Sequence, residues 1–470
     1  MRHTGNSMKI LFGLSFFAVL LLIFVPVGAA VNSDSSPSLN CQETLLRAPL
    51  VEFKSALKRH AANEQQQCDW AFALDALLKL PRVNTDILSY EGGFRLSSDR
   101  FGESKYATLD YSFGVFTYDP KRNSIYIIGN PKLSAIAEFP LPEIKNTTDI
   151  SQFAIAEPPI QPFIAFHNTD RVNTGIDNYF RPTGMAKIDN ALMVNYINWY
   201  DARVTETDTS VMFWDSENLT DSKLFGPYQL EGAAHAAGWI SEIPNSLQSL
   251  LGGTHIAGSQ PFASIISRRS VGPSAFAFDA RKSVVYGPSG TIPTIPLLDF
   301  PLKKLLRDRD IYPNPSIVDD ILYNRDGKNK LWTVLSGAAY GFIIPSTRTY
   351  LTIGFSGGHY SGAGYKIVQN NGNKCGGPCA KDATDTYPYY WAWDLKDLVK
   401  VRMGLKQAYD VAPYDYGLLR LPKEIKSVAI ANGSFDSQNN RLFISIRNAD
   451  QEISYKKAPL FLVYKVLNIN

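Results

Sequence analysis

The pattern of apolar and polar residues divides the chain into three parts. An uncharged apolar stretch runs from Ile10 to Val25. Between Cys41 and Lys79, apolar residues recur at helical spacings among good helix formers, which predicts two short helices. From about Ile87 onward, short runs of β-branched and aromatic residues alternate with Gly, Pro, Asn and Asp, which is typical of many strands joined by turns. The pattern therefore predicts an all-β protein with a short α-helical N-terminal extension.

A two-strand unit recurs within the β-rich part. It consists of a small residue, an apolar or aromatic strand, Asp or Pro at a turn, and a second alternating strand. The clearest copies start at Gly114 and Gly433, and weaker copies complete a set whose turn residues are Asp119, Asp189, Asp279, Pro345 and Asp436. Repeated small sheets bury their faces by stacking around a channel, so we expect a β-propeller of five to seven blades. A pair of β-sandwich domains is the alternative that the same strands would fit.

Two stretches carry a resemblance to a known family. The hairpin that starts at Gly114 and its continuation Ile136-Ala-Glu-Phe-Pro-Leu-Pro142 resemble blades of secreted bacterial propellers of the NHL-like kind, and the texture of residues 90–470 is similar to that of propeller polysaccharide lyases. The resemblance includes no diagnostic motif. It implies a propeller whose last blade comes from residues 434–466.

The first thirty residues have the features of a secretory signal peptide. Arg2 and Lys9 precede the apolar stretch, Pro26 follows it, and the small residues up to Ala30 suit cleavage. An uncleaved membrane anchor is the alternative, because the apolar stretch approaches the span of a bilayer. We predict a signal peptide at 1–30, a linker and helical segment at 31–86 and the propeller at 87–470. The mature protein would be extracellular or periplasmic, with no stable membrane span.

Four cysteines remain after the signal, and an even number in an oxidising compartment favours disulfides. The turn Cys375-Gly-Gly-Pro-Cys379 brings its two ends together, so we expect Cys375 to pair with Cys379 and Cys41 with Cys68. The alternative is a zinc site formed by His359, Cys375 and Cys379, for which the sequence indicates no fourth ligand.

Composition and charge narrow the choice of partners. The chain has 470 residues, of which 45% are hydrophobic and 19% charged, and this excludes a disordered or coiled-coil protein. Its formal charge of +3 falls to about +1 without Arg2 and Lys9, and no basic run stands out. We therefore expect no nucleic-acid partner, and we expect a monomer whose attraction to an acidic polymer comes from local groups of arginine and histidine.

Four histidines in loops rich in small residues could take part in catalysis: His167, His235, His255 and His359. In a polysaccharide lyase, a base removes the α-proton of a uronic acid, a cation neutralises its carboxylate, and an acid protonates the leaving oxygen. The candidates are His167 and His255 as base and Tyr200 as acid. Arg171, Arg181 and Arg268 are the candidates for binding the carboxylate.

A second chemistry would use the histidines as metal ligands. In a lactonase or another metal-dependent hydrolase, histidines hold a divalent metal that activates water. His235 and His359 are the candidate ligands, and calcium, manganese or zinc is the candidate metal. Paired carboxylates from Asp201, Glu231 and Asp394 are a further alternative, for which no spacing is diagnostic.

The aromatic run Tyr387-Pro-Tyr-Tyr-Trp-Ala-Trp393 has two interpretations. Flat aromatic side chains stack on pyranose rings, so Trp391 and Trp393, together with Tyr360, are candidate sugar-binding residues. The other interpretation is alternating core aromatics of one strand. The sequence thus predicts a secreted propeller that acts on an extracellular polysaccharide or glycan, most concretely a lyase. The alternative is a propeller that binds carbohydrate or protein without catalysis, and the sequence does not decide between them.

Overall fold

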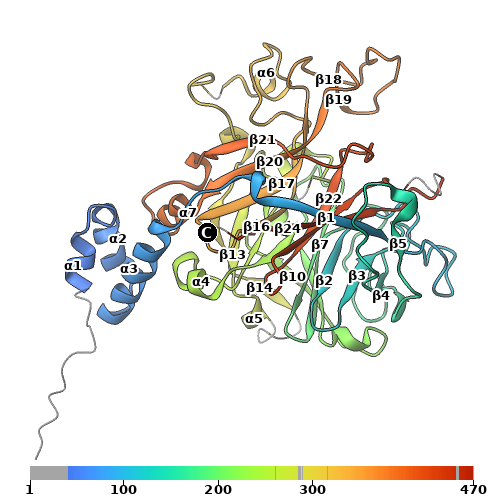
Figure 1. Cartoon of the computed structure of the whole chain (residues 1–470), viewed down its shortest axis with the longest axis horizontal. Coiled ribbons are helices and arrows are strands. Elements are labelled where there is room, and N and C mark those ends of the chain that lie inside the picture. The colour runs from blue at the N-terminus through green and yellow to red at the C-terminus, as the bar shows by residue number, and fades with distance from the viewer. Residues whose placement is uncertain are drawn as a thin grey trace, which may run out of the picture. The chain divides into compact units, whose positions relative to one another are not determined.

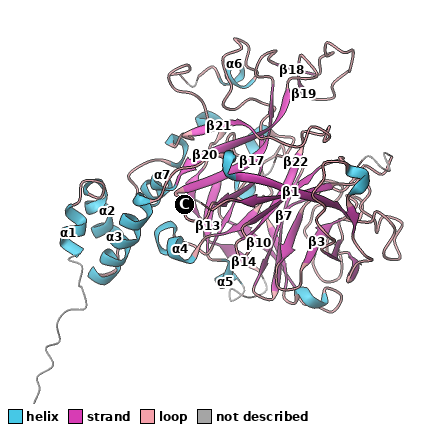
Figure 2. Cartoon of the chain, in the orientation of Figure 1, coloured by secondary structure: helices cyan, strands magenta, loops and turns pink. Residues whose placement is uncertain are grey.

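The computed structural model describes residues 41–259, 261–283, 287, 289–314, 316–450 and 455–468. Within them, five small sheets form a five-bladed β-propeller. Figures 1 and 2 show that strands make up most of this part of the chain. The expected propeller is therefore confirmed, with the smallest number of blades in the expected range. The proposed signal peptide, residues 1–30, lies outside the described residues. No helix in the described part of the chain is long and apolar enough to cross a membrane.

Each blade is built mainly from four strands that follow one another from the inside outward. The first contains β2 (Phe116–Asp119), β3 (Ser124–Ile128), β4 (Ile136–Pro140) and β6 (Gln161–Ile164). The second contains β7 (Phe180–Ile188), β8 (Ala191–Asn198), β9 (Ser210–Phe213), β10 (Leu224–Leu230) and the added β14 (Gly290–Ile292). The third contains β11 (Ile240–Glu242), β12 (His255–Ala257), β13 (Ala275–Phe278) and β15 (Ile295–Leu298). The fourth contains β16 (Gly337–Ile343), β17 (Thr349–Gly357), β20 (Thr386–Asp394) and β21 (Asp415–Leu418). An insertion in this blade forms β18 (Ala363–Tyr365) and β19 (Pro378–Ala380).

The fifth blade joins the two ends of the β-rich region. Its first three strands from the channel outward are β22 (Ile430–Asp436), β23 (Arg441–Ile446) and β24 (Leu460–Val466). Its two outermost strands are β1 (Leu88–Arg95) and β5 (Ala154–Ile155). Strand β1 pairs antiparallel with β24, from Leu88 opposite Val466 to Phe94 opposite Phe461. This pairing closes the ring, because a strand from the N-terminal part of the β-rich region completes the sheet formed by the last three strands of the chain. Residues 434–466 thus supply the end of β22 and all of β23 and β24, as the resemblance implied, whereas the two outer strands come from the N-terminal part of the β-rich region.

The inner strands β2, β7, β11, β16 and β22 contact one another in cyclic order around the channel. One pocket is lined by residues where inner strands begin, including Arg181 near the start of β7 and Ile430 at the start of β22. We call this end of the channel the start face. Another pocket is lined by residues where the strands end, including Asp119, Ile188 and Asp436, and we call this end the turn face. The five inner strands therefore all run from the start face to the turn face.

The recurring Asp of the sequence repeat has a structural role at the turn face. The Asp119 carboxylate accepts hydrogen bonds from the backbone N–H groups of Lys121 and Arg122, at 2.9 and 3.4 Å. Asp436 does the same with Gln438 and Asn439, at 3.0 and 3.2 Å. The side chain thereby closes the hairpin turn after an inner strand, which is the usual role of Asp in such turns.

One copy of the repeat was assigned wrongly. Asp279 follows β13, the third strand of its blade, whereas the other four turn residues follow inner strands. The inner hairpin of that blade was missed because helix α4 (Asn245–Leu251) separates β11 from β12, so no short turn marks it. A helix in place of a turn removes the local sequence signal of a hairpin.

The helical extension contains α1 (Cys41–Leu46), α2 (Lys54–His60) and α3 (Glu64–Lys79), one helix more than the sequence predicted. Asn63 caps α3 by accepting a hydrogen bond from the backbone N–H of Gln66 at 2.8 Å. Both predicted disulfides are confirmed: Cys41–Cys68 ties α1 to α3, and Cys375–Cys379 lies in the insertion of the fourth blade. The sulfurs are therefore not available to a zinc site with His359.

The remaining helical elements are short. The α-helices are α5 (Ala280–Ser283), α6 (Val318–Leu322) and α7 (Leu395–Arg402). The 3-10 turns are Val51–Phe53, Thr85–Ile87, Ile150–Gln152, Ser216–Asn218, Ala233–His235, Ile266–Arg268, Leu302–Lys304 and Ala408–Asp410.

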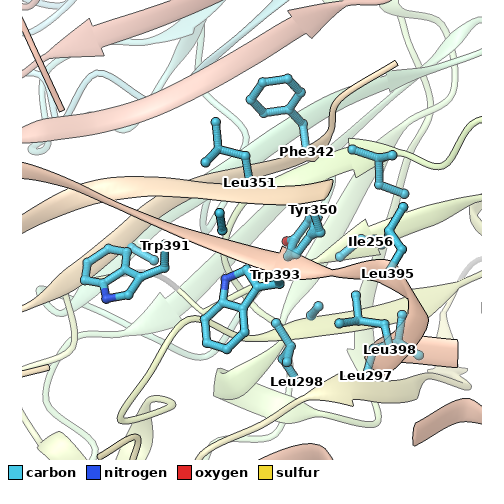
Figure 3. Close-up of a cluster of buried hydrophobic side chains, with 14 of the residues drawn as sticks. Ile256, Leu297, Leu298, Phe342, Tyr350, Leu351, Trp391, Trp393, Leu395 and Leu398 are labelled. Carbon is cyan, nitrogen blue, oxygen red and sulfur yellow. The ribbon is translucent and has the colours of Figure 1, made fainter. Parts of the chain in front are cut away.

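The two tryptophans of the aromatic run in β20 lie in the core, as Figure 3 shows. Trp391 and Trp393 are both 0% exposed. Their indole N–H groups donate to the Leu331 carbonyl at 2.8 Å and to the Thr352 hydroxyl at 3.0 Å. The two tryptophans are therefore core residues, and no sugar ring can stack on them. This corrects their assignment as substrate-binding residues.

Candidate functional site

A cavity of about 420 Å³ opens at the start face of the channel. It is lined by Phe113, Arg181, Trp199, Pro261, Phe262, Phe355, Ala429, Ile430, Ala431 and Arg447. Two of these described residues are arginines, several are aromatic, and none is acidic. The cavity therefore combines positive charge with flat apolar surface, and residues from all five blades contribute to its lining.

The two arginines converge on the ring of Phe113. The guanidinium carbon of Arg447 lies 4.5 Å from the centre of this ring, and that of Arg181 lies 5.5 Å from it. Arg447 also lies 5.6 Å from the ring of Phe262, which itself packs at 5.3 Å from Phe113. Cation–π contacts thus hold both guanidinium groups in place without neutralising them.

Neither arginine forms an ion pair with a carboxylate in the described part of the chain. Arg181 Nη1 donates to the carbonyls of Asn178 and Phe180, at 3.1 and 2.7 Å. The Nε of Arg447 is buried and has no hydrogen-bond partner among the described residues. Burial lowers the pKa of both arginines, and the neighbouring charge of Arg181 lowers the pKa of Arg447 further. Keeping two partly buried guanidinium groups charged without a carboxylate nearby raises the free energy of the folded protein, and a bound anion would lower it.

Arg269 adds a third cation beside the cavity. Its Nη1 donates to the carbonyl of Pro261, a lining residue, at 3.2 Å, and burial lowers its pKa to about 10. Its neighbour Arg268 is engaged elsewhere, because Nη2 lies 2.9 Å from the Asp201 carboxylate and donates to the Glu206 carbonyl at 2.7 Å. Neither arginine of this adjacent pair lines the cavity; Arg269 is linked to it only through the Pro261 carbonyl, and Arg268, which the sequence favoured, is bound to Asp201.

Three exposed aromatic residues continue the cavity onto the surface, and we call Tyr179, Trp199 and Tyr200 the aromatic platform. Their ring centres lie 6.0 to 6.1 Å apart. The backbone N–H of Trp199 donates to the Tyr179 carbonyl at 2.7 Å, which joins the two segments. Between 36% and 50% of each residue is exposed, so a flat ligand can lie against them.

His167 packs against Phe180, the residue between Tyr179 and Arg181. Its ring stacks on Phe180 with 3.7 Å between the ring centres, and its Nδ1 is 2.8 Å from the Thr174 hydroxyl. Burial lowers its pKa, so the imidazole is neutral at neutral pH. Phe180 directly precedes Arg181, and this places His167 near the cavity although it does not line it.

His255 lies at the other end of the channel. It lines the pocket of about 270 Å³ at the turn face together with Lys187, Glu242, Arg281 and Asp436. Only 8% of His255 is exposed, and burial lowers its pKa to about 4. The structure therefore does not bring His255 together with Tyr200, which follows β8 at the start face.

The candidate metal ligands are separately engaged. His235 Nδ1 lies 2.6 Å from an Asp299 carboxylate oxygen, and His359 Nε2 lies 2.7 Å from the Ser356 hydroxyl. Among the described residues, no group of three or more His, Cys, Asp or Glu side chains is arranged to hold a metal. The expected convergence of histidines is therefore not found in this part of the chain.

Arg171 and Tyr360 also have other surroundings. Arg171 Nη2 donates to the carbonyls of Leu219 and Ser222 and so fastens a loop. Tyr360 is 72% exposed and lies below the Lys330 ammonium, 4.5 Å from its ring centre. Tyr360 belongs to the insertion of the fourth blade and does not line the cavity.

The three candidate catalytic carboxylates do not form a pair. Asp201 is bound to Arg268, Asp394 caps α7 by accepting from the Lys396 N–H at 3.0 Å, and Glu231 accepts from the Thr294 N–H at 3.1 Å. Each has a structural partner of its own. The arrangement of two facing carboxylates that glycoside hydrolysis requires is therefore not formed by these residues.

Arg447 and Phe113 were missed by the sequence analysis. Arg447 directly follows β23, the second strand of its blade, and Trp199 directly follows β8, the second strand of the second blade. The two residues thus occupy equivalent positions in two blades. An alignment of blades would have indicated Arg447, but Phe113 precedes the first inner strand and carries no local signal.

Comparison with protein-family models and with curated proteins finds no match for this chain. The fold and the site therefore define it only as a five-bladed β-propeller with a cationic, aromatic cavity at the start face of its channel.

Proposed function

We propose that this protein is a secreted propeller that binds acidic carbohydrate, specifically glycans that carry uronate carboxylates, in the start-face cavity. The observation that carries the proposal is the pair Arg181 and Arg447, which share one cavity without an acidic partner among the described residues. A bound carboxylate would receive charge-assisted hydrogen bonds from them, and these are stronger than neutral ones.

The aromatic platform supports a carbohydrate over other organic anions. Trp199 lines the cavity and belongs to the platform, so a ligand held by the arginines continues onto exposed flat rings. Pyranose rings have apolar faces that pack on such side chains. The small net charge of the chain cannot attract a polyanion, so the attraction would come from the two arginines that line the cavity, Arg181 and Arg447.

Cleavage by β-elimination is the second candidate function, and the position of Tyr200 favours it. Tyr200 lies beside Trp199, with 6.1 Å between the ring centres. With the uronate carboxylate held by arginine, a base would remove the α-proton, a carbon–carbon double bond would form, and the bond to the leaving oxygen would break. Tyr200 would protonate that oxygen, and the neutral His167 is the candidate base.

Binding is tested by calorimetric titration of polygalacturonate and alginate oligosaccharides, with their methyl-esterified or reduced neutral forms as ligand controls. We expect Arg181→Gln and Arg447→Gln each to weaken binding of the acidic forms about 10- to 100-fold, since hydrogen bonds to charged groups contribute about 1.5–3 kcal/mol. Arg325→Gln, an exposed arginine outside the cavity, is the matched control. Equal affinity for acidic and neutral oligosaccharides would contradict the proposal.

Cleavage is tested separately by following the absorbance of new unsaturated uronate ends. A lyase would produce them in the wild type and far fewer in Tyr200→Phe. If the protein binds the oligosaccharides but forms no unsaturated ends, it is a propeller that binds glycans without lyase activity.

A further inference from the structure

An insertion in the fourth blade extends the protein at the rim of the start face. Strand β17 runs antiparallel to the inner strand β16 and therefore returns to the start face, where its residue Phe355 lines the cavity. The chain leaves the blade after Gly357 and re-enters it with β20 at Thr386. Figure 1 shows β18 and β19 of this insertion, together with α6, in a part that projects from the blades. The insertion therefore begins and ends on the face that carries the cavity.

Residues 323–330 and 358–385 form one unit, which we call the basic tip. The buried Asn324 side chain donates to the Gly358 carbonyl at 2.8 Å. The Asp385 carboxylate accepts hydrogen bonds from the backbone N–H groups of the three residues that follow Gly358, at 2.7 to 3.1 Å. Buried hydrogen bonds therefore hold the two segments of the basic tip against each other.

The basic tip carries an excess of positive charge. Its two segments contain six lysine and arginine residues and three aspartates. This excess equals the formal charge of the whole chain, +3, so the rest of the chain contains equal numbers of basic and acidic residues. A local concentration of one sign of charge attracts an oppositely charged polymer even where the net charge is small. The basic tip therefore provides a local group of cations of the kind that attraction to an acidic polymer requires.

The lysines of the basic tip differ from its aspartates in their partners. Asp326 accepts from the Tyr312 hydroxyl at 2.6 Å, and Asp382 accepts from the Thr384 backbone N–H at 2.8 Å. Five exposed lysines of the basic tip form no ion pair within the described part of the chain: Lys328, Lys330, Lys366, Lys374 and Lys381. Their ammonium groups can therefore bind an anionic ligand without first breaking an ion pair.

Exposed aromatic rings lie next to two of these lysines. The Lys330 ammonium lies 4.5 Å from the centre of the Tyr360 ring, and the Lys366 ammonium lies 5.2 Å from that of Tyr365. Tyr360 is 72% exposed and Tyr365 is 58% exposed. A flat ring beside an ammonium suits a sugar that carries a carboxylate, because the ring packs on the apolar face of the sugar while the ammonium pairs with its charge.

We propose that the basic tip is a second binding surface for acidic polysaccharide, over which a chain held in the start-face cavity continues. The inference rests on the proposed function for the class of ligand, but it uses none of the cavity residues. Tyr360 follows Phe355 by five residues, which span at most about 18 Å. A polymer can therefore reach both surfaces, whereas a short oligosaccharide occupies one of them.

The location of the basic tip favours acidic polysaccharide over an anionic lipid surface, which the same lysines would also attract. The tip lies on the face that carries the cavity and the aromatic platform, so its cations extend a surface already suited to sugars. Val368 is the one large aliphatic side chain of the tip that is exposed. This apolar area is too small to insert among acyl chains.

Titration calorimetry with trigalacturonate and polygalacturonate, at low salt and at about 0.15 M salt, tests this surface. We expect the double variant Lys330→Gln/Lys366→Gln to bind the polymer about 5-fold more weakly than the wild type at low salt, and to bind the trimer unchanged. Lys54→Gln/Lys58→Gln removes the same charge from exposed positions of α2 and is the matched control. It should bind both ligands like the wild type.

A second double variant separates stacking from charge. Tyr360→Ala/Tyr365→Ala should weaken binding of the polymer severalfold at both salt concentrations, because salt does not screen stacking. Equal affinity for the polymer in the wild type and in both tip variants would overturn the proposal, and so would an equal loss in the α2 control. Phosphatidylglycerol vesicles that bind the wild type but not the lysine variant, without any binding of polygalacturonate, would overturn it in favour of a lipid surface.

The same titrations distinguish this inference from the proposed function. Loss of trigalacturonate binding in Arg447→Gln tests the cavity and does not involve the basic tip. Polymer binding that depends on Lys330 and Lys366 but survives Arg181→Gln and Arg447→Gln would support the basic tip and contradict the cavity as a binding site.

Discussion

The guanidinium of Arg447 lies 4.5 Å from the ring of Phe113, and the two residues come from opposite ends of the β-rich chain. Phe113 precedes the first inner strand, and Arg447 follows the second strand of the last blade. They meet because the ring closes through β1 and β24. The cavity that contains them is therefore a product of ring closure, and its chemistry is testable residue by residue.

Phe113→Leu should weaken binding of acidic oligosaccharides about 3- to 10-fold. The substitution removes the ring that holds Arg181 and Arg447, and cation–π contacts contribute about 0.5–2 kcal/mol. Calorimetric titration measures the change. Phe225→Leu, in an outer strand away from the cavity, should bind like the wild type. Unchanged affinity in Phe113→Leu would show that the ring does not position the arginines.

Gly184→Ala should destabilise the propeller by about 2–4 kcal/mol. A Cβ at Gly184 in β7 would lie 1.9 Å from the carbonyl oxygen of Gly238, which precedes β11, so the two inner strands would have to separate. Urea unfolding measures the loss. Gly376→Ala is the matched control, because a Cβ there meets nothing within 4 Å. Equal stability of the two variants would mean that the inner strands are not in close contact at Gly184.

Stability should fall between about pH 6.5 and pH 4 because of His359. Burial lowers the pKa of His359 from 6.5 to about 4, so over this interval the unfolded chain binds a proton that the folded protein does not. The stabilisation is fully present above pH 6.5, is lost as pH falls, and is gone below about pH 4. The difference in pKa corresponds to about 3 kcal/mol.

Urea unfolding at pH 8 and pH 5 checks this sign. His359→Gln, which preserves a polar group beside Ser356, should reduce the pH dependence, whereas the exposed His60→Gln should leave it unchanged. His255 should add a decrease of the same sign, because burial lowers its pKa to about 4 as well. A stability that rises on acidification over this range would contradict the assignment.

Removal of the Cys41–Cys68 disulfide should cost more than removal of Cys375–Cys379. The first closes a loop with a sequence separation of 27 residues and the second a loop of 4, and the entropy lost by the unfolded chain increases with loop length. We expect losses of about 3.5 and 2 kcal/mol for the paired Cys→Ser variants. Hydrogen exchange should show the first loss in residues 41–79. Equal protection of these residues with and without the bond would contradict this prediction.

The sequence alone determined the class of fold and both disulfides. Alternating apolar residues, the small residues before each strand and Asp119 or Asp436 at the turn are local signals, because each hairpin satisfies its own hydrogen bonds. The short turn around Cys375 and Cys379 is equally local. Where a helix replaced a turn, as at α4, the local signal failed and the inner hairpin of the third blade was missed.

Only the tertiary structure decided which candidate residues share a site. His167, Tyr200 and His255 were predicted to act together, yet two lie near the start face and one lies at the turn face, since the direction of each strand decides which end of the channel a residue reaches. Trp391 and Trp393 are core residues because neighbouring parts of the protein cover both faces of the fourth blade. Arg181 of the second blade and Arg447 of the fifth share a cavity for a related reason: a closed ring gathers the start-face ends of its blades around one channel, and no local pattern in a sequence predicts that contact.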